Sequence, residues 1–428
     1  MSIEYERLRL LWPDHLGLAR GKYLPKETAG EGTKHTINLF GLGFDRVIYD
    51  HPGAMLHDGL PDMDAEVDLD DVRPGWEADT AIVIPDITRL GEPVMMAPRN
   101  VLIDEISRWA DLGYSPVVGV ELEAYLFEPD GSGGWRPIST DGAYVYGTGT
   151  AVDPTGTIDL IMETARTVGI SLESVHSEFD NGQFELTLHF SDALAIADDV
   201  FLFKVMAREI ATRQGLLLTF MGKPINARGG SGFHVNLSLN DEDGVNALFD
   251  ETAEDGLSDL CRAATAGMLE HHVGMTALVA PTVNSYKRIQ PGSLCGYWAN
   301  WGYDHRGVTV RVPPTRGMGT RLEHRLGDGS VTPHQAIAAV LAAARLGVEN
   351  GYELPPAETG DCIEEASTDV IAPRSLGEAL DALEADSVFV EAFGSAYVDG
   401  FLTVKRAEWE RYRTWTTDWE MSEYLPFL

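Results

Sequence analysis

Four segments of the chain alternate apolar and polar side chains with a period of two, which is typical of half-buried β-strands. They are residues 119–127, 176–190, 231–239 and 320–328. One face of each segment is apolar enough to join a core, and the other carries carboxylate, imidazole or guanidinium groups. A single strand of this kind indicates only a solvated face. Four together predict a sheet that buries one face and gathers charged groups on the other.

The polar faces of these strands are rich in acids. The side chains on or beside them are Glu121, Glu123, Glu178, Glu185, His234, Asn236, Ser238, Arg321, Glu323 and Arg325. If the faces converge, five carboxylates and one histidine share a cavity, which would be costly without cations. Carboxylates with a single imidazole suit Mg²⁺ or Mn²⁺ better than zinc. Interleaved arginines suit phosphate and carboxylate groups, so the pattern predicts a metal-dependent enzyme acting on nucleotides or phosphates.

Composition narrows the class of protein further. The formal net charge of −35 argues against binding to nucleic acid or to an anionic membrane. Adaptation to salt and a cation site both remain open as reasons for the acidity. Three cysteines without CxxC spacing indicate a reducing compartment and argue against a disulfide scaffold or a thiolate zinc site. No long apolar run or signal-peptide pattern is evident, so we expect a cytoplasmic protein with no membrane span.

The pattern of the chain changes near residue 97. Residues 1–97 look like short strands joined by acidic turns, and residues 97–113 have a helical period. Asn100 is the expected N-cap of this helix and Gly113 its expected C-cap. Beyond it, strands and helices alternate without a Rossmann or P-loop motif. The sequence therefore predicts an α+β protein with domains at residues 1–97 and 98–428.

Six motifs in order resemble the glutamine synthetase family along nearly the whole chain. They are VVGVELEAYLF, SEFDNGQFEL, KPINARGGSGFHVNLSL, APTVNSYKRIQPG, DHRGVTVRVP and TRLEHRLGD. The resemblance implies an N-terminal β-grasp domain, a catalytic domain with an antiparallel sheet and helices, and a homododecamer of two hexameric rings with active sites between subunits. It also implies that the γ-carboxylate of glutamate takes the γ-phosphate of ATP, after which an amine displaces phosphate.

The resemblance also assigns roles to individual residues. It implies a first divalent ion, Mg²⁺ or Mn²⁺, on Glu121, His234 and Glu323, and a second on Glu123, Glu178 and Glu185. It places ATP against Glu173, Ser238, Arg306, Arg311 and Arg321, and glutamate against Arg288, Arg325 and Gly230. Catalytic roles fall on Arg306, Glu178 and Asp50.

Departures from the family pattern bear on the amine substrate. Leu294 occupies the position of the flap glutamate in ammonia-using members, and residues 290–299 contain no acid. The motif around the ammonium-site aspartate is altered, with Asp50 in YDHPGAML as its nearest counterpart. Aromatic faces can hold an alkylammonium ion and bury its organic part. The chain therefore resembles the γ-glutamyl-amine ligase branch, and we expect a small monoamine substrate bound by Leu294, Tyr297, Trp298 and Trp301 beside Cys295.

Several alternatives remain at this stage. The aromatic side chains could pack a loop or a subunit contact. The chain could be an ammonia-using glutamine synthetase, or a catalytically inactive ring-forming relative. Asn236 stands where the family often has a second histidine, and Gly229 stands where it has an asparagine. An acid substrate related to glutamate is therefore also open.

Overall fold

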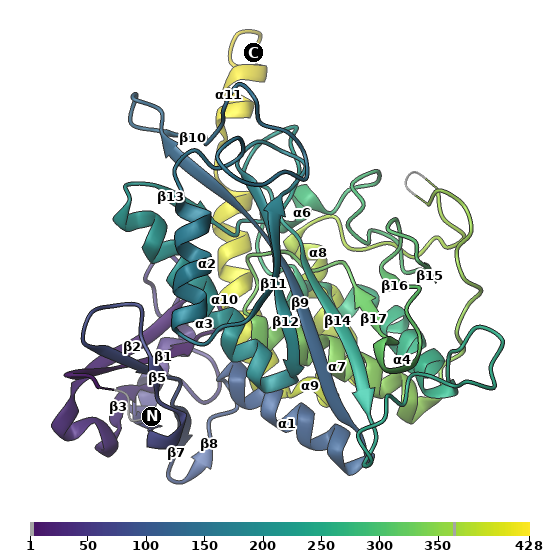
Figure 1. Cartoon of the computed structure of the whole chain (residues 1–428), viewed down its shortest axis with the longest axis horizontal. Coiled ribbons are helices and arrows are strands. Elements are labelled where there is room, and N and C mark those ends of the chain that lie inside the picture. Colours follow the sequence, from purple (N-terminus) through teal and green to yellow (C-terminus); the bar gives the residue numbers. More distant parts are fainter. Residues whose placement is uncertain (1–3, 363–364) are drawn as a thin grey trace.

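Strand β9 (Ser115–Pro129) runs through the middle of the largest sheet in the computed structural model, which describes residues 4–362 and 365–428 (Figure 1). In the described residues this sheet has nine strands, ordered β11-β12-β9-β14-β17-β16-β15, with β10 and β13 also paired to β9. Their bounds are β10 Trp135–Pro137, β11 Leu172–Ser177, β12 Gln183–Asp192, β13 Leu217–Thr219, β14 Phe233–Asn240, β15 Trp301–Tyr303, β16 Val310–Val312 and β17 Leu322–His324. The pairing is antiparallel except between β15 and β16.

The register of the sheet puts the predicted acids side by side. Glu185 of β12 lies opposite Glu123 of β9, and His234 of β14 lies opposite Glu121. Directly opposite residues of antiparallel strands project from the same face. The charged side chains therefore gather on one face, as the alternation predicts.

Helices cover the other face of the sheet. The helices α1 (Pro98–Asp111), α3 (Ala193–Arg213) and α7 (Pro333–Asn350) contact its strands. Val120 and Leu122 of β9 are completely buried between the strands and this helical layer. Burial of such side chains contributes roughly 1.5–3 kcal/mol each, so the apolar face fixes the orientation of the acidic one.

The N-terminal part has a core of its own, formed around Leu8, Leu10, Trp12, Phe40 and Met63. Its two four-stranded sheets are ordered β2-β1-β6-β5 and β3-β4-β7-β8. The strands are β1 Arg7–Pro13, β2 Ala19–Pro25, β3 Thr33–Thr36, β4 Asp62–Glu66, β5 Arg73–Pro74, β6 Thr80–Val83, β7 Asp86–Arg89 and β8 Glu92–Pro93. The predicted α+β class, with an N-terminal sheet domain before the larger sheet and its helices, is confirmed. The domain limits 1–97 and 98–428 stay a prediction.

The start of α1 differs from the sequence prediction. The helix begins at Pro98 with Ala97 as its N-cap, so Asn100 is not the cap. Proline suits the first turn because its missing N–H would have no helical acceptor there. Asn100 lies inside the helix, and its amide donates to the carbonyls of Ile87 and Val94. Gly113 follows the C-cap Leu112 with a φ of 85°, a conformation that glycine adopts readily.

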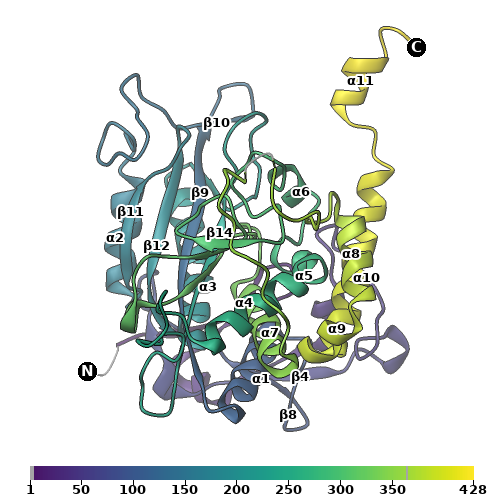
Figure 2. The ribbon, with the colours of Figure 1, turned by 90° about the vertical axis from the view of Figure 1, so that its right-hand side faces the viewer.

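The remaining helices pack beside the sheet and run to the C-terminus. They are α2 Thr157–Thr167, α4 Asp259–Glu270, α5 His272–Val279, α6 Ser285–Arg288, α8 Leu376–Ala385, α9 Ser387–Phe393, α10 Ser395–Arg413 and α11 Asp418–Tyr424. Figure 2 shows α11 projecting from the body of the molecule beyond α10. Within the two described stretches, no helix is both long and apolar enough to cross a membrane.

Candidate active site

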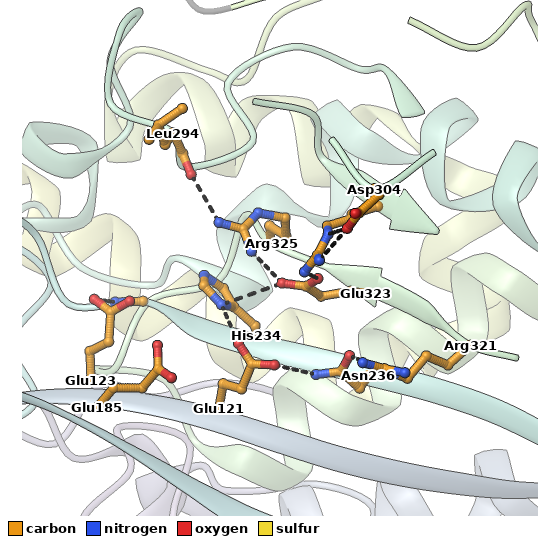
Figure 3. Close-up of polar contacts among 12 residues, drawn as sticks. Glu121, Glu123, Glu185, His234, Asn236, Leu294, Asp304, Arg321, Glu323 and Arg325 are labelled. Atoms are coloured by element: carbon orange, nitrogen blue, oxygen red, sulfur yellow. Dashed lines mark hydrogen bonds and ion pairs between the residues drawn. The ribbon is translucent and has the colours of Figure 1, made fainter. Parts of the chain in front are cut away.

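The first acidic cluster joins three strands of the large sheet. Glu121, His234 and Glu323 each offer a donor atom, and these atoms lie within 4.8 Å of one another. The Nδ1 atom of His234 is 3.3 Å from Glu121 and 3.7 Å from Glu323 (Figure 3). Burial raises the pKa of Glu121, but the hydrogen bond and charge of His234, the hydrogen bond from Asn236 and the charge of Arg325 together lower it to about 2. Glu121 is therefore a carboxylate at neutral pH.

Two arginines surround Glu323, which is completely buried. Arg311 of β16 donates to it at 2.7 Å, and Arg325 also donates to it. Arg311 reaches Asp304 as well, at 2.5 Å. Ion pairs with two guanidinium groups compensate this buried carboxylate for its lost hydration.

The second cluster is purely carboxylate. Glu123, Glu178 and Glu185 bring oxygens within 4.8 Å of one another. Burial raises the pKa of Glu178 to about 7, and the charges of Glu123 and Glu185 add to this effect. One oxygen of Glu178 is buried and has no hydrogen-bond partner within the described part of the chain. Three crowded carboxylates with an unpartnered oxygen fit a divalent cation.

Both clusters satisfy the donor chemistry of Mg²⁺ or Mn²⁺. Each offers three groups at short range, two carboxylates with an imidazole in one and three carboxylates in the other. Hard divalent cations prefer oxygen ligands, and a single imidazole is compatible with Mn²⁺. The residues that the sequence nominated for two metals are therefore brought together in the groups expected.

A cavity of about 450 Å³ opens beside the first cluster. Residues that line it include Glu121, Glu173, Phe190, Asn236, Ser238, Met318 and Arg321. Asn236 lines this cavity and links two of its side chains: its amide donates to Glu121 at 3.2 Å and accepts from Arg321 at 3.1 Å (Figure 3). Phe190 is 59% exposed and stacks on His189 with ring centroids 4.6 Å apart. The cavity thus combines an aromatic wall, a cation and acidic groups, which suits a nucleotide.

The residues expected at the glutamate site also meet. The Arg288 guanidinium is nearly buried and donates to the carbonyl of Leu326 at 2.8 Å. A Cβ atom on Gly230 would come within 2.7 Å of the Arg288 side chain, so only glycine allows this approach. The buried Nε atom of Arg325 has no acceptor in the described residues. An unpartnered guanidinium donor fits an anionic ligand.

The segment after Arg288 is arranged differently from the aromatic wall predicted by the sequence. Tyr297 and Trp301 are buried to 7% and 4% exposure and belong to the hydrophobic core. The indole of Trp301 donates to the carbonyl of Pro355 at 2.7 Å, and half-buried Trp298 packs edge-on against Tyr297. Buried, hydrogen-bonded aromatics are packing groups. In this conformation Tyr297 and Trp301 pack in the core, and their contact with the amine stays a prediction.

Leu294 is an exposed apolar residue of this segment. Its side chain is 47% exposed, its φ is 52°, and its carbonyl lies 3.5 Å from Nη2 of Arg325 (Figure 3). Positive φ is uncommon for leucine, so the surrounding segment holds this conformation. Leu294 therefore lies over the acidic site while the aromatics that follow it turn inward.

Two nominated catalytic residues have different positions. Arg306 is exposed, and its charge opposes the increase in the pKa of Glu178. Asp50 lies on an exposed loop and accepts from the backbone N–H of Leu56 at 3.0 Å. Its neighbour Tyr49 contacts Arg411 of α10 at 2.7 Å. Within one chain, Asp50 is not brought to the acidic clusters.

Sequence reasoning missed two residues beside Glu178. His176 lies opposite Glu185 on β11, and its Nε2 atom is 3.2 Å from that carboxylate. Its place two residues before Glu178 in the alternating strand could have revealed it. Tyr146 packs edge-on against His176 at 5.8 Å and feels the charge of Glu178, which raises its pKa. Its loop has no periodicity, so no sequence pattern indicates its position.

Comparisons with known proteins agree with this fold. A family model described as the catalytic domain of glutamine synthetase matches residues 95–424. The chain is 32% identical to the glutamine synthetase of Halobacterium salinarum, with 98% of this chain and 93% of that one covered. It is 34% identical to the glutamine synthetase of Thermus thermophilus, with 98% and 95% covered.

Solved structures show the same relationship. Apo GmaS superimposes with a TM-score of 0.85 at 31% identity, covering 98% of this chain and 97% of that one. A GmaS/ADP complex gives a TM-score of 0.84 at 31% identity, covering 99% and 97%. A structure described as a novel glutamine synthase homolog shares the fold, with a TM-score of 0.83 at 24% identity, covering 100% and 99%. These matches define an ATP-dependent carbon–nitrogen ligase. The chain belongs to the glutamine synthetase family.

Proposed function

We propose that the protein joins the γ-carboxylate of L-glutamate to a small organic monoamine, through a γ-glutamyl phosphate formed from ATP. The observation that supports this most is Leu294. The backbone carbonyl of Leu294 contacts Arg325 at 3.5 Å, and its exposed apolar side chain occupies the position where the resemblance to ammonia-using members implies an acid. Without that acid, an ammonium ion loses a compensating charge, whereas an organic substituent gains an apolar contact.

The similarity to GmaS, a γ-glutamylmethylamide synthetase, supports the same choice. Because Tyr297 and Trp301 are buried, we assign the contact with the amine to Leu294 and Tyr146 and give the inward aromatics a packing role. Trp298, which is half-buried, would support the Leu294 segment from behind.

The chain's own residues would hold the other two substrates. Arg288 and Arg325 would bind the carboxylates of glutamate, with the backbone at Gly230 close to its amino group. Arg321, Ser238 and Glu173 would line the nucleotide site, and Arg306 and Arg311 would neutralise the transferred phosphoryl group. One arginine of each set, Arg325 and Arg311, donates to Glu323, each to a different carboxylate oxygen.

The two clusters would hold the divalent ions, with Glu121, His234 and Glu323 in one and Glu123, Glu178 and Glu185 in the other. Mg²⁺ or Mn²⁺ bound there would supply charge neutralisation for the phosphates. Glu178 would serve the transfer of the phosphoryl group together with Arg306, whose positive charge opposes the increase in the pKa of Glu178.

We also propose that the protein works as a ring-shaped homo-oligomer, a dodecamer of two hexamers, in the cytoplasm. The exposed apolar side chains at the C-terminus support contact with a second copy. Asp50, which lies away from the clusters of its own chain, would then complete the site of a neighbouring subunit.

An assay of phosphate release with saturating glutamate and ATP tests which amine is the preferred substrate. Ammonium, methylamine, ethylamine, ethanolamine, putrescine and aniline are compared by kcat/KM. We expect a small monoamine to give the highest value, and the γ-glutamylamide to be detected by mass spectrometry. The highest value with ammonium would overturn the proposal.

An ammonia-using glutamine synthetase is the second candidate. The curated relatives named above carry that name at 32% and 34% identity over nearly the whole chain. The same amine panel decides between the two, because both predict ATP turnover but with different best amines.

A further inference from the structure

We propose that Asp180, outside both acidic clusters, is a positioning residue that sets the affinity for the amino-acid substrate. It does so by fixing the backbone at Gly229 and Gly230. This inference rests on the proposed function for the identity of that substrate. The side chain of Asp180 is only 8% exposed, although it carries a charge. A buried carboxylate persists when its hydrogen bonds compensate for lost hydration.

The contacts of Asp180 converge on one glycine. Its Oδ2 atom accepts from the backbone N–H of Gly229 and lies 3.1 Å from the hydroxyl of Tyr125, a completely buried side chain. The same hydroxyl is 3.1 Å from the carbonyl of Gly229. The other carboxylate oxygen of Asp180, Oδ1, accepts a hydrogen bond from Arg228 at 3.2 Å. Asp180, in the loop between β11 and β12, and Tyr125 of the central strand β9 thus hold both sides of the Gly229 backbone.

Gln183 continues this network toward the acidic site. Its amide donates to the carbonyl of Gly230 at 3.0 Å and to Glu123 at 3.2 Å. Its side-chain oxygen accepts from the backbone N–H of Asp180 at 3.3 Å. Glu123 in turn accepts from the N–H of Gly232 at 2.8 Å. The segment 229–232 is therefore fixed at one end by Asp180 and at the other by Glu123.

The opposite side of this segment faces the residues proposed to bind glutamate. A Cβ atom on Gly230 would lie 2.7 Å from the Arg288 side chain, and one on Gly232 would lie 3.1 Å from its guanidinium and 3.2 Å from Glu123. A shift of Gly229 and Gly230 would therefore alter the space between Arg288 and Glu123. Arg288 supplies that space with a cation for a carboxylate of the amino acid, next to the Gly230 backbone proposed to lie close to its amino group.

Gly229 also has no room for the asparagine that the family pattern would place there. Its Cβ atom would come within 2.9 Å of Asp180 and of Gln183. In this chain the carboxylate of Asp180 occupies the space where a side chain of residue 229 would lie. It accepts a hydrogen bond from the backbone N–H of Gly229. The departure at Gly229 is thereby compensated by Asp180 instead of weakening the site.

The test compares Asp180→Ala, Asp180→Asn and the neighbouring Asn181→Ala. Asn181 is exposed and bonds only to Ser139 in the described contacts, so its variant is the matched control. We expect Asp180→Ala to raise the KM for glutamate about tenfold or more, the loss expected for a charge-assisted hydrogen bond. The kcat and the KM for ATP should change less than about threefold. Asp180→Asn, which can still accept from Gly229, should restore much of the affinity.

Calorimetric binding of glutamate separates this inference from the proposed function. The wild type could bind glutamate even if none of the amines tested supported turnover. If Asp180→Ala then lost that binding, the role of Asp180 would stand while the proposed function failed. An unchanged KM and unchanged binding in a folded Asp180→Ala would overturn the inference. A parallel loss of kcat and of both KM values would also overturn it, since that pattern indicates general disruption.

Discussion

The Nδ1 atom of His234 lies 3.3 Å from a carboxylate oxygen of Glu121 on the neighbouring strand. The contact follows from the register, which sets these two residues opposite each other. It helps to lower the pKa of Glu121 to about 2 against the effect of burial, whereas burial and two neighbouring acids raise the pKa of Glu178 to about 7. Two carboxyl groups on one sheet face therefore have pKa values moved in opposite directions, that of Glu121 downward and that of Glu178 upward.

The second cluster predicts a metal-dependent loss of activity. Replacing Glu123 with Gln removes one carboxylate from the group formed with Glu178 and Glu185. We expect turnover with every amine to fall at least about 100-fold and one class of bound Mn²⁺ to be lost, because a charged oxygen ligand is replaced by a neutral one. Titration with Mn²⁺ followed by electron paramagnetic resonance measures the binding. Glu128→Gln, near the end of the same strand and paired with Arg136, is the control. Full Mn²⁺ binding by Glu123→Gln would contradict the assignment.

Leu294 predicts a change in amine preference without loss of the phosphoryl step. Leu294→Glu restores an acid at the exposed position beside Arg325. We expect kcat/KM for ammonium to rise relative to the best monoamine by about tenfold, because an ammonium ion regains a counter-charge. Arg306→Ala should instead reduce turnover with all amines. Equal effects of Leu294→Glu on every amine would show that this residue does not contact the amine.

The sheet and its charged face could be predicted from the sequence because alternation with a period of two determines which side chains share a face. Glu121, Glu123, Glu185 and His234 meet for this reason. Burial of Tyr297 and Trp301 could not be predicted in the same way. Their segment has only the short strand β15, and its packing depends on Pro355, which is distant in sequence. Asp180 was missed because its partners, Gly229 and Tyr125, are also far along the chain.

Asn236 predicts coupling between the nucleotide and the first cluster. It links Arg321 to Glu121 through hydrogen bonds of 3.1 and 3.2 Å. Removing both with Asn236→Ala frees the guanidinium on the cavity wall, so we expect the KM for ATP to rise about 3- to 10-fold. The KM for glutamate serves as the internal control and should stay within about twofold. Steady-state kinetics with ATP varied at saturating glutamate provide the measurement, and an unchanged KM for ATP would refute the link.

Buried histidines predict sensitivity to acid. Burial lowers the pKa of His15 to about 3 and that of His272 to about 4. An unfolded histidine has a pKa of about 6.5, so the unfolded chain binds more protons below that pH. Stability from these groups is complete above about pH 6.5 and is lost as the pH falls toward their folded values, by about 1.4 kcal/mol per unit for each histidine.

The thermal midpoint measured from pH 7.5 to 5 tests this expectation. In His15→Gln the midpoint should fall less steeply with pH than in the wild type, because one buried titrating group is gone. His57→Gln, at an exposed histidine, should follow the wild type. Identical pH profiles for the wild type and His15→Gln would exclude a contribution from His15.

The projecting C-terminal segment predicts dependence of assembly on apolar contacts. Trp415 is 74% exposed, Trp419 is 61% exposed and Phe427 is 84% exposed in the single chain. Exposed groups of this size usually mark an interaction surface. We expect Trp419→Asp and removal of residues 415–428 to reduce the particle mass measured by light scattering after size-exclusion chromatography. Glu423→Gln changes a polar side chain of the same helix and should leave the mass unchanged. Because the core of each subunit does not involve this segment, circular dichroism should stay the same. A truncated protein with the wild-type particle mass would show that this segment is not needed for assembly.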